Sequence, residues 1–255
     1  MDKRNICLYI SYDGRNYNGW QKQRKHSSVQ ETIENVLVKI FNEKISLVGA
    51  GRTDSKAHAI KYTANFKTSN FSIPVNKLKK VLNDRLPSDI RILNVKEVNI
   101  DFHSRFSAKA REYVYIIYNG KDILPHFKDY VYHIDDEINI NRLQEGLKIF
   151  CGVHNFKNFC SGYSQNEDKN FERIIYYFRV KKVKILGGNF IIFFIKGNGF
   201  LQGMIRTLVS VALNYERGLI EKELIIKALK NETKLENKYR VLVPASGLYF
   251  KRAYY

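Results

Sequence analysis

The sequence has few of the residues that stabilise small secreted proteins or hold metal ions. Only 3 of its 255 residues are cysteine. These residues, Cys7, Cys151 and Cys160, show no C-x-x-C spacing. An odd number of widely spaced cysteines argues against a disulfide framework and against a cysteine zinc site. We therefore expect all three to be reduced.

Metal-binding histidine pairs and phosphate-binding glycine loops are also missing. The 6 histidines form no H-E-x-x-H pair, and the sequence contains no G-x-x-x-x-G-K-[ST] loop. The sequence therefore implies neither a metal ion nor a nucleotide, and we expect the protein to need no cofactor.

Long apolar runs are absent. No run reaches the roughly 18 residues that a membrane-spanning helix requires. The most apolar region, residues 190–215, is interrupted by Lys196 and Arg206. The first residues lead into only a short apolar stretch without a small-residue cleavage site, so no signal peptide is predicted. We expect a cytoplasmic protein with no membrane association.

Acidic residues are few relative to basic ones. The chain has 25 Asp and Glu against 43 Lys and Arg, which gives a net charge of +18 and an isoelectric point near 9.7. This excess points to a polyanionic partner such as a nucleic acid. Alternatively, the excess reflects a genome biased toward lysine, asparagine and isoleucine. The positions of the arginines must therefore decide between a polyanionic partner and such a bias.

Hydrophobic periodicity predicts the order β-α-β-β-α-β in the first part of the chain. Residues 6, 8 and 10 alternate as in a half-buried strand, and Ser28 with Glu31 forms a capping box before a helix that runs to Phe41. The remaining strands are expected at 45–50, 61–67 and 90–98, and the second helix between Pro74 and Pro87.

The second part repeats this order without repeating the sequence. Strands are expected at 111–118, 173–185, 190–196 and near 248, and helices at 141–150, 201–215 and 221–229. Gly187-Gly188 is expected to turn a hairpin. The sequence thus predicts an α+β fold of two ferredoxin-like halves with a mixed, largely antiparallel sheet, divided into residues 1–100 and 101–255.

Three segments combine charge with turn-forming residues. The first, residues 51–59, carries Arg52, Asp54 and His58 in a loop that a substrate could reach. The alternative is a surface hairpin with a weak arginine–carboxylate pair.

In the second segment, Arg111, Tyr113 and Tyr115 should share one face of a strand because side chains alternate along it. Such a row can hold a phosphate and stack an unpaired base. The alternative is an ordinary amphipathic strand. In the third segment, Arg206 lies in an otherwise apolar helix, where it must pair with an acid or extend to the surface.

At these residues the sequence resembles the tRNA pseudouridine synthase A family. The matching blocks are Tyr12-Asp13-Gly14-x-x-Tyr17-x-Gly19-Trp20-Gln21-x-Gln23, Gly51-Arg52-Thr53-Asp54, Asn83-x-x-Leu86-Pro87-x-Asp89-Ile90, Phe102-His103-Ser104-Arg105-Phe106-Ser107-Ala108-x-x-Arg111-x-Tyr113-x-Tyr115, Gly199-Phe200-Leu201-x-x-Met204-Ile205-Arg206 and Ser246-Gly247-Leu248. A lone G-R-T-D would be weak evidence, but the ordered set spans nearly the whole chain.

The resemblance implies the pseudouridine synthase fold around a basic cleft, a homodimer, and conversion of uridine to pseudouridine at tRNA positions 38, 39 and 40 of the anticodon stem-loop. It also implies that no cofactor takes part.

By the same resemblance Asp54 is the catalytic aspartate, Tyr113 contacts the target base and Arg206 pairs with Asp54. We assign four residues to substrate binding, namely Arg52, His58, Arg111 and Tyr115.

Two departures from the family pattern bear on this interpretation. Ser55-Lys56-Ala57 stands where the family has Ala-Gly-Val, so a lysine replaces a glycine two residues after Asp54. Gln202-Gly203 replaces a bulkier pair, which is expected to loosen the start of the helix that carries Arg206.

Two other functions remain open at this point. A ferredoxin-like sheet also serves as an RNA-binding platform without catalysis, although the aromatic strand motif of that class is missing here. A duplicated synthase with drifted specificity would keep the chemistry and change the RNA.

Overall fold

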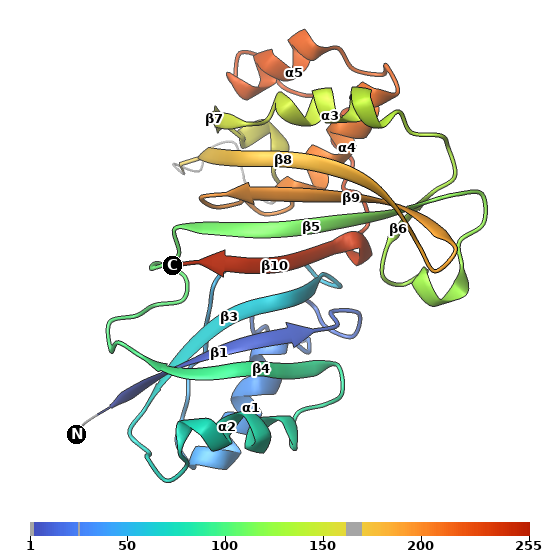
Figure 1. The fold of residues 1–255 in the computed structure, drawn as a ribbon. Coiled ribbons are helices and arrows are strands. Elements are labelled where there is room, and N and C mark those ends of the chain that lie inside the picture. Colours follow the sequence, from blue (N-terminus) through green and yellow to red (C-terminus); the bar gives the residue numbers. More distant parts are fainter. Residues whose placement is uncertain (1–2, 25, 162–169) are drawn as a thin grey trace. The chain divides into compact units, whose positions relative to one another are not determined.

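The computed structural model describes residues 3–24, 26–161 and 170–255. By its internal contacts the chain divides into two compact units (Figure 1), unit 1 comprising Met1–Arg111 with Tyr249–Tyr255 and unit 2 comprising Glu112–Leu248. The predicted division at residue 100 differs from this in two respects. Unit 1 continues to Arg111, and it includes the last strand of the chain.

Unit 1 is an α+β unit with a largely antiparallel sheet. Its elements are β1 (Arg4–Tyr12), α1 (Val29–Phe41), β2 (Val48–Gly49), β3 (His58–Thr68), α2 (Val75–Asn83), β4 (Ile90–Val98) and, from Tyr249 on, β10 (Leu248–Tyr254). Strand β1 pairs antiparallel with β3 on one side and with β4 on the other. The order β-α-β-β-α-β predicted for this part of the chain is confirmed.

Strand β1 lies at the centre of this sheet and is more buried than its alternating pattern suggested. Ile6, Leu8 and Ile10 are fully buried, and Cys7 on the opposite face is buried too. The predicted half-buried strand is therefore buried on both faces over much of its length. Helix α1 begins as expected, because the Ser28 side chain accepts a hydrogen bond from the Glu31 N–H.

Strand β2 is much shorter than the predicted strand at 45–50. Side chains of α1 hold the preceding backbone instead: the Leu47 N–H donates to Glu34 Oε1 at 2.9 Å, and its carbonyl accepts from Gln30 Nε2 at 3.0 Å. The edge of β3 is also shared, since β2 pairs with residues 64–65 and β10 pairs in parallel with residues 58–59. The backbone of Leu47 is therefore bound by α1 and does not extend the pairing of β2 with β3.

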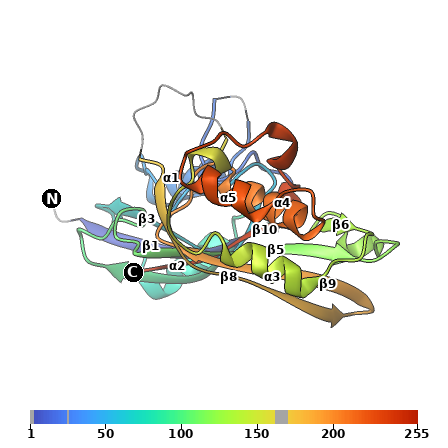
Figure 2. The same cartoon turned by 90° about the horizontal axis from the view of Figure 1, so that it is seen from above.

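Within unit 2, the strands follow the order β5-β9-β8-β7. Its elements are β5 (Ala110–Asn119, from Glu112 on), β6 (Tyr132–Ile134), α3 (Ile140–Lys148), β7 (Gly152–Asn155), β8 (Glu172–Ile185), β9 (Gly188–Gly197), α4 (Met204–Glu216) and α5 (Lys222–Leu229). Helix α3 packs against α4 and β8 (Figure 2). The short strands β6 and β7 were not predicted.

The hairpin between β8 and β9 is confirmed, with its turn one residue earlier than expected. Leu186 and Gly187 adopt positive φ angles of 48° and 79°, and Gly188 already pairs with Ile185. In the described part of the chain, no helix is both long enough and apolar enough to cross a membrane.

Candidate active site

Asp54 lies in the loop that joins β2 to β3, here called the Asp54 loop (residues 50–57). Its side chain is partly exposed, between the exposed Arg52 and Ser55. A turn closes the loop, because the Ala57 N–H donates to the Asp54 carbonyl oxygen at 3.1 Å. Part of Asp54 is therefore exposed to solvent.

The segment that follows β1 fixes the Asp54 loop on both sides of the carboxylate. Before Asp54, the Thr53 hydroxyl lies 2.8 Å from the Tyr12 hydroxyl. The backbone N–H of Trp20 donates to the Thr53 carbonyl at 3.4 Å. After Asp54, the Lys56 N–H donates to the Tyr17 carbonyl at 3.1 Å. Several independent hydrogen bonds thus define the backbone that carries Asp54.

A buried aromatic cluster supports the start of the loop. The rings of Trp20 and Tyr62 lie 4.1 Å apart, and Tyr12 packs against both. The Tyr62 hydroxyl accepts from the Gly51 N–H and donates to the Gly51 carbonyl. Large buried rings adopt few rotamers, so this cluster is a rigid base for the loop.

Two glycines let the segment after β1 lie directly against the Asp54 loop. A Cβ on Gly19, whose φ is 82°, would overlap the Thr53 carbonyl, and a Cβ on Gly14 would overlap the Ala57 carbonyl. The sequence motif included both glycines but gave them no role. In the structure they are required for the close approach of two backbones.

Lys56 adopts a left-handed conformation with φ 66°. An L-residue with a Cβ is strained there by about 1–2 kcal/mol, a cost that glycine does not have. Lys56 therefore has a backbone conformation that favours glycine. It adds strain and an exposed cation two residues from Asp54.

His58 is buried inside unit 1. Its Nδ1 accepts from the Gly14 N–H at 3.2 Å and lies 3.2 Å from Asp13 Oδ1, while its ring stacks on Tyr249 at 4.7 Å. Only 2% of the residue is exposed. This placement does not support the predicted contact of His58 with RNA. Through its hydrogen bond with the Gly14 N–H, His58 holds the end of the Asp54 loop against the segment that follows β1.

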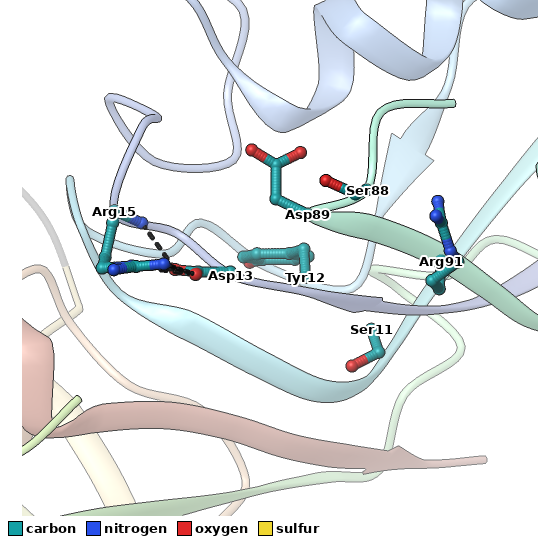
Figure 3. A pocket seen from close by; sticks show the side chains of 7 residues that line it. All are labelled: Ser11, Tyr12, Asp13, Arg15, Ser88, Asp89 and Arg91. Carbon is teal, nitrogen blue, oxygen red and sulfur yellow. Dashed lines mark hydrogen bonds and ion pairs between the residues drawn. The ribbon is translucent and has the colours of Figure 1, made fainter. Parts of the chain in front are cut away.

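A shallow pocket beside this segment has a lining of mixed charge. It contains Asp13 and Asp89 together with Ser11, Tyr12, Arg15, Ser88 and Arg91 (Figure 3). Arg15 pairs with Asp13 at 2.8 Å, and the Tyr17 hydroxyl donates to Asp89 at 2.8 Å. Burial and this hydrogen bond raise the pKa of Tyr17 well above 10. We infer that Asp89 anchors Tyr17, and through it the Asp54 loop.

Arg111 connects three backbone carbonyls of unit 1. Its Nε donates to Ala50 at 3.1 Å, one terminal nitrogen donates to Ala108 at 3.3 Å, and the other donates to Arg105. The guanidinium was expected to hold a phosphate of the RNA. Its hydrogen bonds instead fix the backbone at the start of the Asp54 loop.

In unit 2, Tyr115 is fully buried and its hydroxyl donates to the Pro244 carbonyl at 2.8 Å. Burial raises the pKa of Tyr115 well above 10, although the charge of Arg206 acts in the opposite direction. A ring with no exposed surface cannot stack on a base. This structure therefore gives no support to the prediction that Tyr115 binds the substrate, and it places the ring in the core of unit 2.

Tyr113 and Arg206 are the other two predicted residues of unit 2. Tyr113 is 6% exposed and meets Phe200 edge to face at 5.2 Å. Arg206 is the third residue of α4, and its Nε donates to the Val243 carbonyl at 2.6 Å. Gly203 precedes α4 with φ 68°. Glycine is thus suited to the left-handed conformation at the entry into this helix.

The described residues, 3–24, 26–161 and 170–255, contain no group of three or more His, Cys, Asp or Glu side chains that could hold a metal ion.

Comparison with known proteins gives matches along the whole chain. A family described as "tRNA pseudouridine synthase" matches residues 8–107 and 147–255. "tRNA pseudouridine synthase A" of Clostridium acetobutylicum is 39% identical over 256 residues, covering 99% of this chain and 100% of that protein. The protein of the same description from a Thermoanaerobacter species is 36% identical over 253 residues, with the same coverage.

Among solved structures, "Crystal Structure of a Cbf5-Nop10-Gar1 Complex" aligns with 96% of this chain and 57% of the matched chain. The TM-score is 0.39 and the sequence identity is 13%. This likeness is too distant to support a conclusion about this chain.

Proposed function

On the premise that the chain belongs to the tRNA pseudouridine synthase A family, we propose how its residues carry out the reaction. As a member of this family it is an isomerase that converts uridine to pseudouridine in the anticodon stem-loop of tRNA. Because the substrate is tRNA, we place the reaction in the cytoplasm.

We propose that the fold consists of two ferredoxin-like halves around a basic cleft. In unit 1, β4, β1, β3 and β2 follow the order expected of such a half, and adjacent strands are antiparallel. In unit 2, β5, α3, β8, β9 and α4 follow the order of the first five elements of unit 1, with the short strands β6 and β7 between them. The net charge of +18 supports a cleft that binds the RNA backbone.

The reaction breaks the bond between N1 of uracil and C1′ of the ribose, turns the base, and joins C5 to C1′. The proton on C5 must leave, and N1 gains one, so the product is an isomer. Asp54 is the anionic group that promotes cleavage and manages the proton. The observation that carries this assignment is a partly exposed carboxylate on a loop whose backbone is fixed on both sides.

Three further residues complete the proposed site. Arg52 is exposed next to the buried Thr53, where it can bind a phosphate beside the target nucleotide. Tyr113 contacts the flipped base, which recovers part of the few kcal/mol that unstacking costs. Arg206 is the proposed ion-pair partner of Asp54 in the complex with the substrate.

The proposed function is tested by mapping pseudouridines in an unmodified tRNA pool after incubation with the pure protein. We expect new pseudouridines in the anticodon stem-loop. Absence of turnover with retained binding would mean an RNA-binding protein without this activity. Turnover only at other positions would mean a synthase with changed specificity.

Replacing Arg206 with Met should lower turnover by about 100-fold or more, because the change removes the proposed cation and keeps only an unbranched apolar side chain. Arg206→Lys should retain part of the activity, because it keeps the charge and loses the planar fork. Single-turnover rates on an anticodon stem-loop hairpin measure both. Equal rates for Met and Lys variants would contradict the ion-pair role.

We also propose that the protein acts as a homodimer that binds one tRNA across both subunits. The proposal rests on the family resemblance. Light scattering should give twice the 29.9 kDa mass of the chain. A monomer that remains fully active at the same concentration would contradict it.

A further inference from the structure

Phe106 is unusual among the large apolar residues of unit 1, because 76% of it is exposed. It lies in the loop between β4 and β5, here called the Phe106 loop (residues 102–107). The ring of His103 stacks on it at a centroid distance of 4.4 Å and an interplanar angle of 29°. The Arg105 guanidinium lies 5.5 Å from the centre of the same ring. The loop thus presents a flat aromatic surface beside a cation.

The Phe106 loop is held by buried polar side chains. Asn65 of β3 accepts from the Ser104 N–H at 2.8 Å, and Asn5 of β1 donates to the Phe102 carbonyl at 2.9 Å. His103 Nδ1 accepts from the N–H groups of Arg105 and Phe106, both at 3.2 Å. The exposed ring therefore stands on a fixed backbone, which is what a preorganised binding surface requires.

The Phe106 loop and the Asp54 loop are joined by one side chain. The guanidinium of Arg111 donates both to the Arg105 carbonyl and to the Ala50 carbonyl. The residue before Phe106 and the start of the Asp54 loop are therefore within hydrogen-bonding distance of the same planar group. All of these residues belong to unit 1.

We propose that Phe106, His103 and Arg105 form a platform on which an unpaired base of the substrate RNA, close to the target uridine, is stacked. An exposed ring next to a guanidinium matches the way proteins bind single-stranded nucleotides, by stacking and by charge. The inference rests on the proposed function, because it takes the RNA to be bound at Asp54. The platform adds a position for a second nucleotide.

The test is the binding of an RNA hairpin with the sequence of a tRNA anticodon stem-loop. Phe106→Ala should weaken binding by about 5-fold or more. Phe106→Trp should keep the affinity, because it retains a flat π face, whereas Phe106→Leu should weaken binding nearly as much as Ala. Since the ring is largely exposed, thermal unfolding of all three variants should match the unchanged protein.

Phe71→Ala is the matched control. Phe71 is 54% exposed and has the Arg4 guanidinium 5.2 Å from its ring centre, so it too is an exposed ring beside a cation. It follows the C-terminal end of β3, whereas the Asp54 loop precedes the other end of this strand. This variant should bind the hairpin as the unchanged protein does. Equal affinities for Phe71→Ala and Phe106→Ala would overturn the platform.

Abasic substitutions along the hairpin loop then identify the stacked base. At one position the loss caused by Phe106→Ala should disappear, because the partner of the ring is already missing. An undiminished loss at every position would contradict stacking. Pseudouridine formation by the unchanged protein is measured in parallel, so a failure of the proposed function appears as absent turnover and remains separate from the binding result.

Discussion

Asp54→Asn should lower pseudouridine formation by about 1,000-fold or more while the protein stays folded. The substitution removes the negative charge and keeps nearly the same shape. The hydrogen bonds that fix the Asp54 loop involve its backbone and the neighbouring Thr53 and Lys56, so they remain. Single-turnover measurement on an anticodon stem-loop hairpin gives the rate.

Binding of the hairpin should survive this substitution. Affinity for RNA comes mainly from contacts of lysine and arginine with phosphates, and the variant loses none of them. Circular dichroism and filter binding serve as controls. If Asp54 were only part of an exposed ion pair, its removal would cost about 0–1 kcal/mol and leave turnover within a small factor. Appreciable activity in the folded Asn variant would refute its assignment as the catalytic residue.

Gly19→Ala should lower the free energy of unfolding by about 2–4 kcal/mol. The new Cβ would overlap the Thr53 carbonyl, and a φ of 82° is strained for alanine. Because Thr53 precedes Asp54, the shifted backbone should also misplace the carboxylate. A misplacement of about 1 Å can lower a rate about 100-fold. Chemical denaturation and single-turnover rates measure the two effects.

Gly51→Ala is the control for stability. It lies in the same loop, but a Cβ there would meet no heavy atom within 4 Å. Its free energy of unfolding should stay within about 0.5 kcal/mol of the unchanged protein. Similar destabilisation by both variants would show that the loop is sensitive to any lost glycine and that the contact with Thr53 is not the cause.

Elements with a local signal could be predicted from the sequence. Residues 90–98 alternate, and β4 has these bounds. Ser28 and Glu31 predict the start of α1, and the structure contains the expected cap. The Asp54 loop was recognisable because glycines and charged residues meet between two strands. In each case the residues that decide the conformation are within a few positions of one another, so the pattern in the sequence contains the cause.

The roles of individual side chains required the fold. Arg111 and His58 were expected at the RNA, yet Arg111 donates to Ala50, Ala108 and Arg105, and His58 is buried against Asp13 and Tyr249. A charge or ring in the sequence shows what a residue can bind. The sequence does not show whether that side chain is already bound to a group from a distant segment of the same chain.

Sequence alone was sufficient for the family, for the order of the elements from β1 to β4 and for the place of Asp54 in a loop, because ordered motifs and local periodicity specify these. Only the tertiary structure decided that β2 is short, that residues 249–255 belong to unit 1, and that Tyr115 is buried while Phe106 is exposed. Strand pairing and burial depend on which distant segments compete for one edge or cover one face, and that competition involves residues far apart in the chain.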